Sequence, residues 1–253
     1  MHHLSIALIT FACVFCSALL GLYLRTLLPE THLGDESIGV VKLATGLIAT
    51  MAALVLGLLI SSAKSSFDMV NASVTRDAAS VIMLDRMLAR YGPQTQEIRS
   101  MLRQVVTVAV QRVASGDPAQ LEKLHSPEAV ERTEYLERKI EDLSPQNDIQ
   151  RRLQARAIEL ADDALAVREL GLLQAAGSTP IALLIALVLW LCIIFGAFGL
   201  FTPANATVII ALFLGALCTS IAIFLILEMN TPLDGIVTVS LSPIREARAV
   251  LGR

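Results

Sequence analysis

The feature that most constrains this chain is the segment from Lys42 to Tyr91, which has no proline along its length. Residues 43–63 are uncharged, and a lysine stands at each end of them. At about 1.5 Å per residue, a helix of this length crosses the ~30 Å core of a bilayer. Residues 64–91 are polar, lack glycine and end at a Gly-Pro pair. The segment therefore predicts one long helix that leaves a membrane and opens a polar helical domain.

The composition also indicates a membrane protein. Hydrophobic residues make up 55% of the 253 residues, more than an ordinary soluble domain carries. Between Leu170 and Leu227 there is no charged residue, and this run is roughly twice as long as one membrane span needs. The formal net charge of −3 gives no basic surface for nucleic acid. We therefore expect a lipid bilayer as a partner and no nucleic acid.

The apolar runs predict an all-α integral membrane protein with four transmembrane helices. The first run has no Lys or Arg before it, so we interpret it as a span and not as a signal peptide. The expected organisation is two spans with a short outer loop in 1–63, a helical domain in 64–179, two more spans in 180–228, and a polar tail in 229–253. The expected spans are 4–24, 43–63, 180–201 and 206–227.

The polar middle of the chain predicts a small bundle of amphipathic helices. The first continues from the second span to Tyr91, and others are expected over 93–114 and 128–143. A further helix is expected to start with Ser144 as its N-cap and Pro145 in its first turn, and to end near Gln174.

The distribution of basic residues predicts the sidedness of the chain. Four spans place both termini and the central domain on one side of the membrane. That side carries more Lys and Arg close to the spans, which favours the cytoplasm. The residues counted on that side are Lys64, Arg76, Arg168, Arg245 and Arg248, against Arg25 and Lys42 on the other.

No signature of catalysis is found in the sequence. It lacks HExxH, GxSxG, GxGxxG and a phosphate-binding loop, so we expect no enzyme, no catalytic residue, no bound metal and no cofactor. Cys13 and Cys16 have the spacing of a redox pair, but their apolar surroundings favour simple packing. His32 with Asp35 and Glu36 could hold a cation, although a solvated loop is the favoured interpretation.

The second span carries a stripe of small residues at steps of three and four. One interpretation is that these residues let helices approach closely. The other is that they line a narrow, mostly apolar ion pathway that gates by dewetting. Both hold if the helix packs against copies of itself around an axis. The stripe consists of Gly46, Thr50, Ala53, Gly57 and Ser61.

A second candidate site follows the fourth span. Glu228, Asn230 and Asp234 lie together with Pro232 and Gly235 at a predicted membrane boundary. Carboxylates and free carbonyls in this setting could form a vestibule that attracts cations. Asn, Pro and Gly are also the residues that end a helix, so the two interpretations stay open.

Several segments taken in order resemble a bacterial membrane family of unknown function described as bestrophin-like. The resemblance covers nearly the whole chain and is weakest over 115–145. The segments are LPETHL (28–33), LVLGLLISSAKSSFD (54–68), RDAASVIMLDRMLARYGP (76–93), FGLFTPANATVI (198–209) and FLILEMNTPLDGIVTVSLSPIREA (224–247).

The resemblance implies a channel. Bestrophins are pentameric ion channels with four spans, a helical cytoplasmic domain between the second and third, and a pore lined by the second. In this chain it points to Leu54 and Leu58 as bulky pore-lining candidates beside the small stripe. The acidic run of the animal members' calcium clasp is absent after Glu228.

Two hypotheses for the function follow from the sequence. The first is a homo-oligomeric ion channel, a pentamer by resemblance, that conducts inorganic ions along the second span. The alternative is a membrane scaffold or sensor whose cytoplasmic helical domain binds a protein partner.

Overall fold

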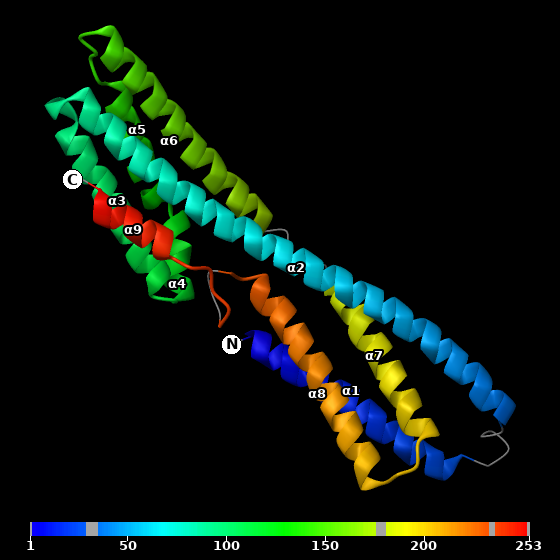
Figure 1. Cartoon of the computed structure of the whole chain (residues 1–253). Helices are drawn as coiled ribbons and strands as arrows, with labels where there is room; N and C mark the ends of the chain where they lie inside the picture. The colour runs from blue at the N-terminus through cyan, green and yellow to red at the C-terminus, as the bar shows by residue number, and fades with distance from the viewer. Residues whose placement is uncertain (1, 29–34, 176–180, 233–235, 252–253) are drawn as a thin grey trace. The chain divides into compact units, whose positions relative to one another are not determined.

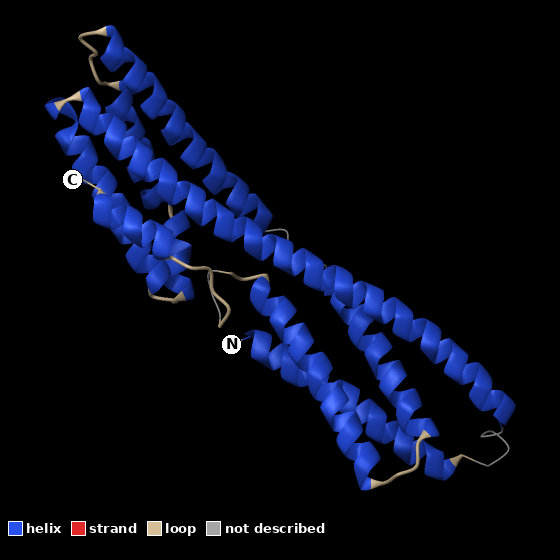
Figure 2. Ribbon diagram, viewed as in Figure 1, coloured by secondary structure: helices blue, strands red, loops and turns tan. Residues whose placement is uncertain are grey.

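The computed structural model of the protein describes residues 2–28, 35–175, 181–232 and 236–251 (Figures 1 and 2). Over these ranges all regular secondary structure is helical, which confirms the all-α prediction. The α-helices are α1 (His2–Leu27), α2 (Asp35–Tyr91), α3 (Gln96–Ala114), α4 (Pro118–Glu122), α5 (Pro127–Glu141), α6 (Asp148–Ala175), α7 (Ile181–Phe201), α8 (Ala206–Met229) and α9 (Ser242–Val250).

The chain divides into two compact units. Unit 1 contains residues 1–66 and 178–230, and unit 2 contains residues 67–177 and 231–253. Helix α2 contributes to both, because it continues without a break from Asp35 to Tyr91. The second half of the predicted long helix is therefore helical as expected, while its start lies several residues before Lys42 and shortens the preceding loop.

Unit 1 holds the apolar helices. In the described residues, four helices are long and apolar enough to cross a membrane, namely α1, the first part of α2, α7 and α8. Helix α1 packs along α7 and α8, and the three phenyl rings of Phe11, Phe15 and Phe213 meet at centroid distances of 5.3–5.8 Å. The turn into α8 is fixed by Asn205, whose side-chain oxygen accepts a hydrogen bond from the Val208 N–H at 2.9 Å.

The closest helix packing in unit 1 uses glycines of α1 and α7. A Cβ atom placed on Gly21 would lie 2.1 Å from the Gly196 carbonyl oxygen, and one on Gly199 would lie 2.1 Å from the Ala18 carbonyl oxygen. Only glycine fits where two backbones come this close. These residues therefore determine the distance between α1 and α7.

Unit 2 is a helical bundle around one apolar core. Leu84 and Leu88 of α2 pack with Ile98 and Leu102 of α3, and Ile140 of α5 is fully buried among them. The buried positions recur every three or four residues, as an amphipathic helix requires.

The turn from α2 to α3 is made by Gly92, whose φ of 136° is open only to glycine. The Thr95 hydroxyl contacts the carbonyl oxygens of Leu88 and Gly92 at 2.5 and 2.8 Å, and so ties this turn to the last turn of α2.

Three local features differ from the sequence predictions. Helix α6 begins at Asp148, and its cap is Asn147, whose Oδ1 accepts the Gln150 N–H at 2.8 Å, so the prediction of Ser144 as N-cap is wrong. The short helix α4 and the tail helix α9 were not expected. Helix α9 forms because Pro243 starts it and because one face, with Ala247, is buried.

Candidate functional site

The first part of α2 has two different faces within one chain. Thr45, Ala52, Leu59 and Ala63 are buried, and the last three belong to the core of unit 1. These positions are seven, seven and four residues apart, so they lie along one side of the helix. The opposite side is left uncovered, and we call it the free face of α2.

The free face carries the stripe of small residues that the sequence singles out. Gly46, Thr50, Ala53, Gly57 and Ser61 are all exposed in the single chain. A Cβ atom added to Gly46 or Gly57 would meet no heavy atom within 4 Å. Within one chain no atom therefore packs directly against these two glycines, in contrast to the glycines of α1 and α7.

Bulky apolar side chains stand next to the stripe. Leu54 is 75% exposed and Leu58 is 62% exposed. The Thr50 hydroxyl donates to the Leu47 carbonyl oxygen at 2.7 Å, so its proton is satisfied within the helix and its lone pairs remain available. The free face thus combines large leucines, small residues and a few hydroxyl groups, with no charge between Lys42 and Lys64.

The second candidate site lies at the end of α8. Glu228 is 5% exposed in the single chain. Asn230 caps the helix, because its Nδ2 donates to the Ile226 carbonyl oxygen at 2.8 Å and its N–H is directed at the same turn. Asp234 lies outside the described residues. The geometry of Asn230 is that of a helix end, and the cation vestibule stays a prediction.

The other chemistry-bearing residues form no site in the described ranges. Cys13, Cys16, Cys192 and Cys218 are free thiols, and the described residues contain no group of three His, Cys, Asp or Glu side chains that could hold a metal ion. His32 and the side chains of Asp35 and Glu36 lie outside what the structure describes.

The family model for the bestrophin-like domain matches residues 11–244. The chain belongs to the bestrophin-like family. Among the curated proteins none matches it.

One solved structure shares the bestrophin-like fold of this chain. It is the crystal structure of a mutant of a bacterial bestrophin homolog from Klebsiella pneumoniae, with 16% sequence identity and a TM-score of 0.58. The alignment covers 96% of this chain and 97% of that one. Together, the family and the four apolar helices establish this bestrophin-like chain as a membrane protein.

Unit 2 of the bestrophin-like chain holds an ion pair that the sequence did not indicate. The guanidinium of Arg99 in α3 binds the carboxylate of Asp85 in α2 with both its Nε and its Nη2. The hydrogen bond with Asp85 raises the pKa of Arg99. The only sequence signal was an acid beside Leu84 and Leu88, close to the predicted inner face of α2.

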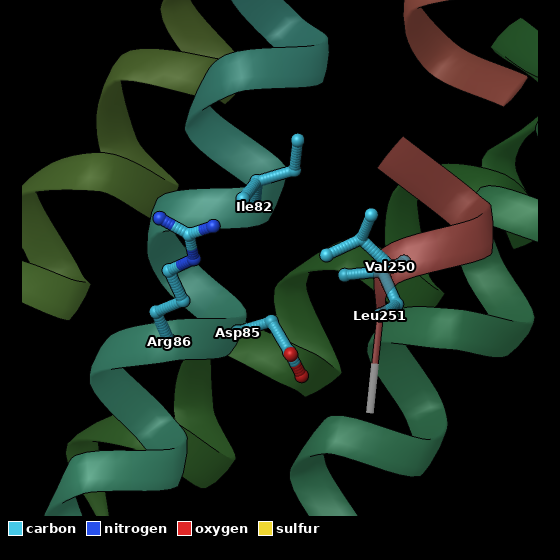
Figure 3. Close-up of a pocket in the computed structure, with 5 residues that line it drawn as sticks. All are labelled: Ile82, Asp85, Arg86, Val250 and Leu251. Atoms are coloured by element: carbon cyan, nitrogen blue, oxygen red, sulfur yellow. The ribbon is translucent and has the colours of Figure 1, made fainter. Parts of the chain in front are cut away.

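A pocket of about 230 Å³ lies next to this ion pair (Figure 3). Figure 3 shows Val250 and Leu251 reaching across it toward Ile82, Asp85 and Arg86 of α2. Leu251 is buried, and its carbonyl oxygen accepts a hydrogen bond of 2.5 Å from Arg103 Nη2. The pocket therefore marks where the tail docks on the bundle.

A pair of acids joins α5 and α6 in the same unit. A hydrogen bond with Asp162, followed by burial and by the neighbouring acids Glu141 and Glu134, raises the pKa of Glu137 to about 7. Asp162 is itself exposed. Its pairing with Glu137 depends on how α5 and α6 pack, which the sequence does not show.

Proposed function

We propose that this protein is a homo-oligomeric ion channel whose pore is lined by the free face of α2. The observation that carries the proposal is that an apolar helix, long enough to span a membrane, leaves one whole side uncovered in the single chain. A side of this kind is covered either by lipid or by copies of the same helix around an axis. The open space at Gly57 leaves room for the second arrangement, because small residues let helices approach closely.

The free face has the chemistry of a narrow apolar pore. Leu54 and Leu58 would form rings of apolar side chains, and such constrictions gate by dewetting. Gly46, Thr50, Ala53, Gly57 and Ser61 would leave room for an ion with part of its hydration shell. The span carries no charged side chain between Lys42 and Lys64, so no fixed charge within it repels cations or anions.

The free face of α2 would also form the contacts between subunits of the oligomer. Copies related by a closed rotation would bury equivalent surfaces around one axis, and the likeness to bestrophins favours five copies. Glu228, Asn230 and Asp234 would then attract cations at one mouth of the pore, if the Glu228 side chain becomes accessible in the assembly.

We further propose four spans in the inner membrane of a bacterium, with both termini and residues 64–179 in the cytoplasm. Two observations support this topology. One is the set of four apolar helices. The other is the excess of Lys and Arg close to the spans on the side that carries the central domain.

Ion flux through liposomes that contain only the purified protein tests the proposal. We expect flux from the wild type, about wild-type flux from Gly57→Ala, and loss of flux from Gly57→Leu, because a leucine fills the stripe. Native mass spectrometry of the same samples gives the subunit number. A monomer, or the absence of flux under gradients of several cations and anions, would contradict the proposal.

A further inference from the structure

A cavity of about 430 Å³ lies within unit 1, between α2 and α7. Its volume falls within the range of small-molecule sites, which is roughly 300–1,000 Å³. One wall comes from α2, and the other comes from the end of α7. Among its lining residues are Lys42, Thr45, Gly46 and Ala49 on α2, and Phe198 and Phe201 on α7.

Two polar groups of this cavity have no partner among the described residues. The ammonium group of Lys42 forms no ion pair there, and the side chain is exposed. The Thr45 hydroxyl makes no hydrogen bond there, although Thr45 is only 7% exposed. By contrast, Thr202 at the same cavity donates to the Phe198 carbonyl oxygen at 2.6 Å. Thr45 Oγ1 is not among the fully buried, unpartnered polar atoms of the described residues, so it is accessible and can hydrogen-bond to a ligand oxygen.

Lys42 and Thr45 both line the cavity, and because they are three residues apart they lie on one side of the helix. A cation and a hydroxyl donor on the same side of a helix suit an anionic oxygen. Apart from Thr202, the remaining wall is apolar and includes two phenyl rings, which a small soluble anion would leave unused. The ligand therefore has an anionic head and an apolar tail.

The place of the cavity in unit 1 selects among such ligands. It lies at the end of the unit where α7 turns into α8 and α2 begins (Figure 1). Lys42 stands immediately before the uncharged run 43–63, which is the level of the lipid headgroups. An ammonium group at this level can form charge-assisted hydrogen bonds with a lipid phosphate.

We propose that this cavity binds one anionic phospholipid per chain, with its phosphate on Lys42 Nζ and Thr45 Oγ1 and an acyl chain along Phe198 and Phe201. This site does not depend on whether the protein conducts ions. It requires only that the end of unit 1 with the α7–α8 turn lies at a membrane surface.

Native mass spectrometry in a neutral detergent tests the site, with phosphatidylglycerol as the probe and phosphatidylcholine as the zwitterionic control. We expect the wild type to bind one phosphatidylglycerol per chain at least several-fold more tightly than phosphatidylcholine. Lys42→Gln should weaken this binding about tenfold, as the loss of one charge-assisted hydrogen bond does. Lys64→Gln removes the lysine at the other end of the run and should bind like the wild type.

Two further variants separate a built site from general surface charge. Thr45→Val keeps the shape and removes only the hydroxyl, and we expect about fivefold weaker binding. Gly46→Leu should abolish the tight binding, because a Cβ there meets no heavy atom within 4 Å and the side chain has space to enter the cavity. Gly39→Leu, equally open but not lining the cavity, is its control.

The outcomes are distinct. Equal binding of the two lipids by the wild type would overturn the site, because it would show only annular lipid. Weaker binding in Lys42→Gln with wild-type binding in Thr45→Val and Gly46→Leu would also overturn it, since only surface charge would then act. Each variant is compared at the subunit number and elution volume of the wild type, so that misfolding is not counted as lost binding.

Discussion

Asp85 and Arg99 form a two-pronged ion pair between α2 and α3, with Nε–Oδ1 and Nη2–Oδ2 distances of 2.8 and 3.0 Å. The carboxylate side chain is 7% exposed and the guanidinium side chain 20% exposed. Removing one partner of such a pair leaves the other charge in a poorly solvated place. The pair therefore ties the helix that leaves unit 1 to the second helix of unit 2.

We predict that Asp85→Asn lowers the free energy of unfolding by about 2–3 kcal/mol, which is less than for a fully buried pair because Arg99 retains some contact with water. Thermal unfolding of the detergent-solubilised protein measures this. Asp148→Asn removes an exposed partner of Arg151 and should change stability by less than about 0.5 kcal/mol. Equal effects of Asp85→Asn and Asp148→Asn on the free energy of unfolding would contradict a stabilising role for the pair of Asp85 and Arg99.

Substitution of glycines should separate packing positions from open ones. Gly199→Ala places a methyl group against the Ala18 carbonyl oxygen and should destabilise unit 1 by about 1–3 kcal/mol, as overpacking does. Gly57→Ala meets no atom within one chain and should leave thermal stability unchanged. Retention of wild-type stability in Gly199→Ala would show that α1 and α7 lie further apart than described.

The docked tail should be released when its last side chain is shortened. Leu251 is buried in the core of unit 2, so Leu251→Ala should cost about 2–5 kcal/mol of tail docking. Limited trypsin digestion should then cut faster after Arg245 and Arg248 in α9. Ile236→Ala, at a position that is 81% exposed and lies outside the pocket that Leu251 lines, is the control. Cleavage at the wild-type rate in Leu251→Ala would show that Leu251 does not hold the tail.

The contact between α5 and α6 should weaken as the pH rises. The pKa of Glu137 is raised to about 7 in the folded state from about 4.3 in an unfolded chain. A raised pKa in the folded state stabilises fully below pH ~4.3, and the contribution is lost as the pH passes through ~7.

The unfolding temperature of the wild type should therefore fall more between pH 5.5 and pH 8 than that of Glu137→Gln, in which an amide replaces the protonated acid. Glu128→Gln, at the start of α5 and exposed, is the control and should follow the wild type. Parallel pH profiles of the wild type and Glu137→Gln would show that Glu137 does not titrate in this range.

The apolar helices were well predicted, because the length of an uncharged run can be read directly from the sequence. Helix ends were less predictable, since Ser144 and Asn147 both suit an N-cap and the choice depends on how α5 and α6 meet. The small residues show most clearly what cannot be predicted from the sequence. Gly57 and Gly199 both lie in apolar helices with other small residues nearby, yet one faces open space and the other faces a backbone. Pairs such as Asp85 with Arg99 depend on tertiary contact and leave no local pattern.

The accessibility of single cysteines tests the pore assignment most directly. In a background with Cys13, Cys16, Cys192 and Cys218 replaced by alanine, Ser61→Cys places a thiol on the free face of α2. Ala52→Cys places one on the buried face of the same helix. The readout is ion flux into liposomes before and after a charged thiol reagent.

If the free face lines the pore, the reagent should block flux through Ser61→Cys and leave flux through Ala52→Cys unchanged. Undiminished flux through Ser61→Cys that mass spectrometry shows to be fully labelled would contradict the account, because a charged group on the free face would then lie away from the ion path.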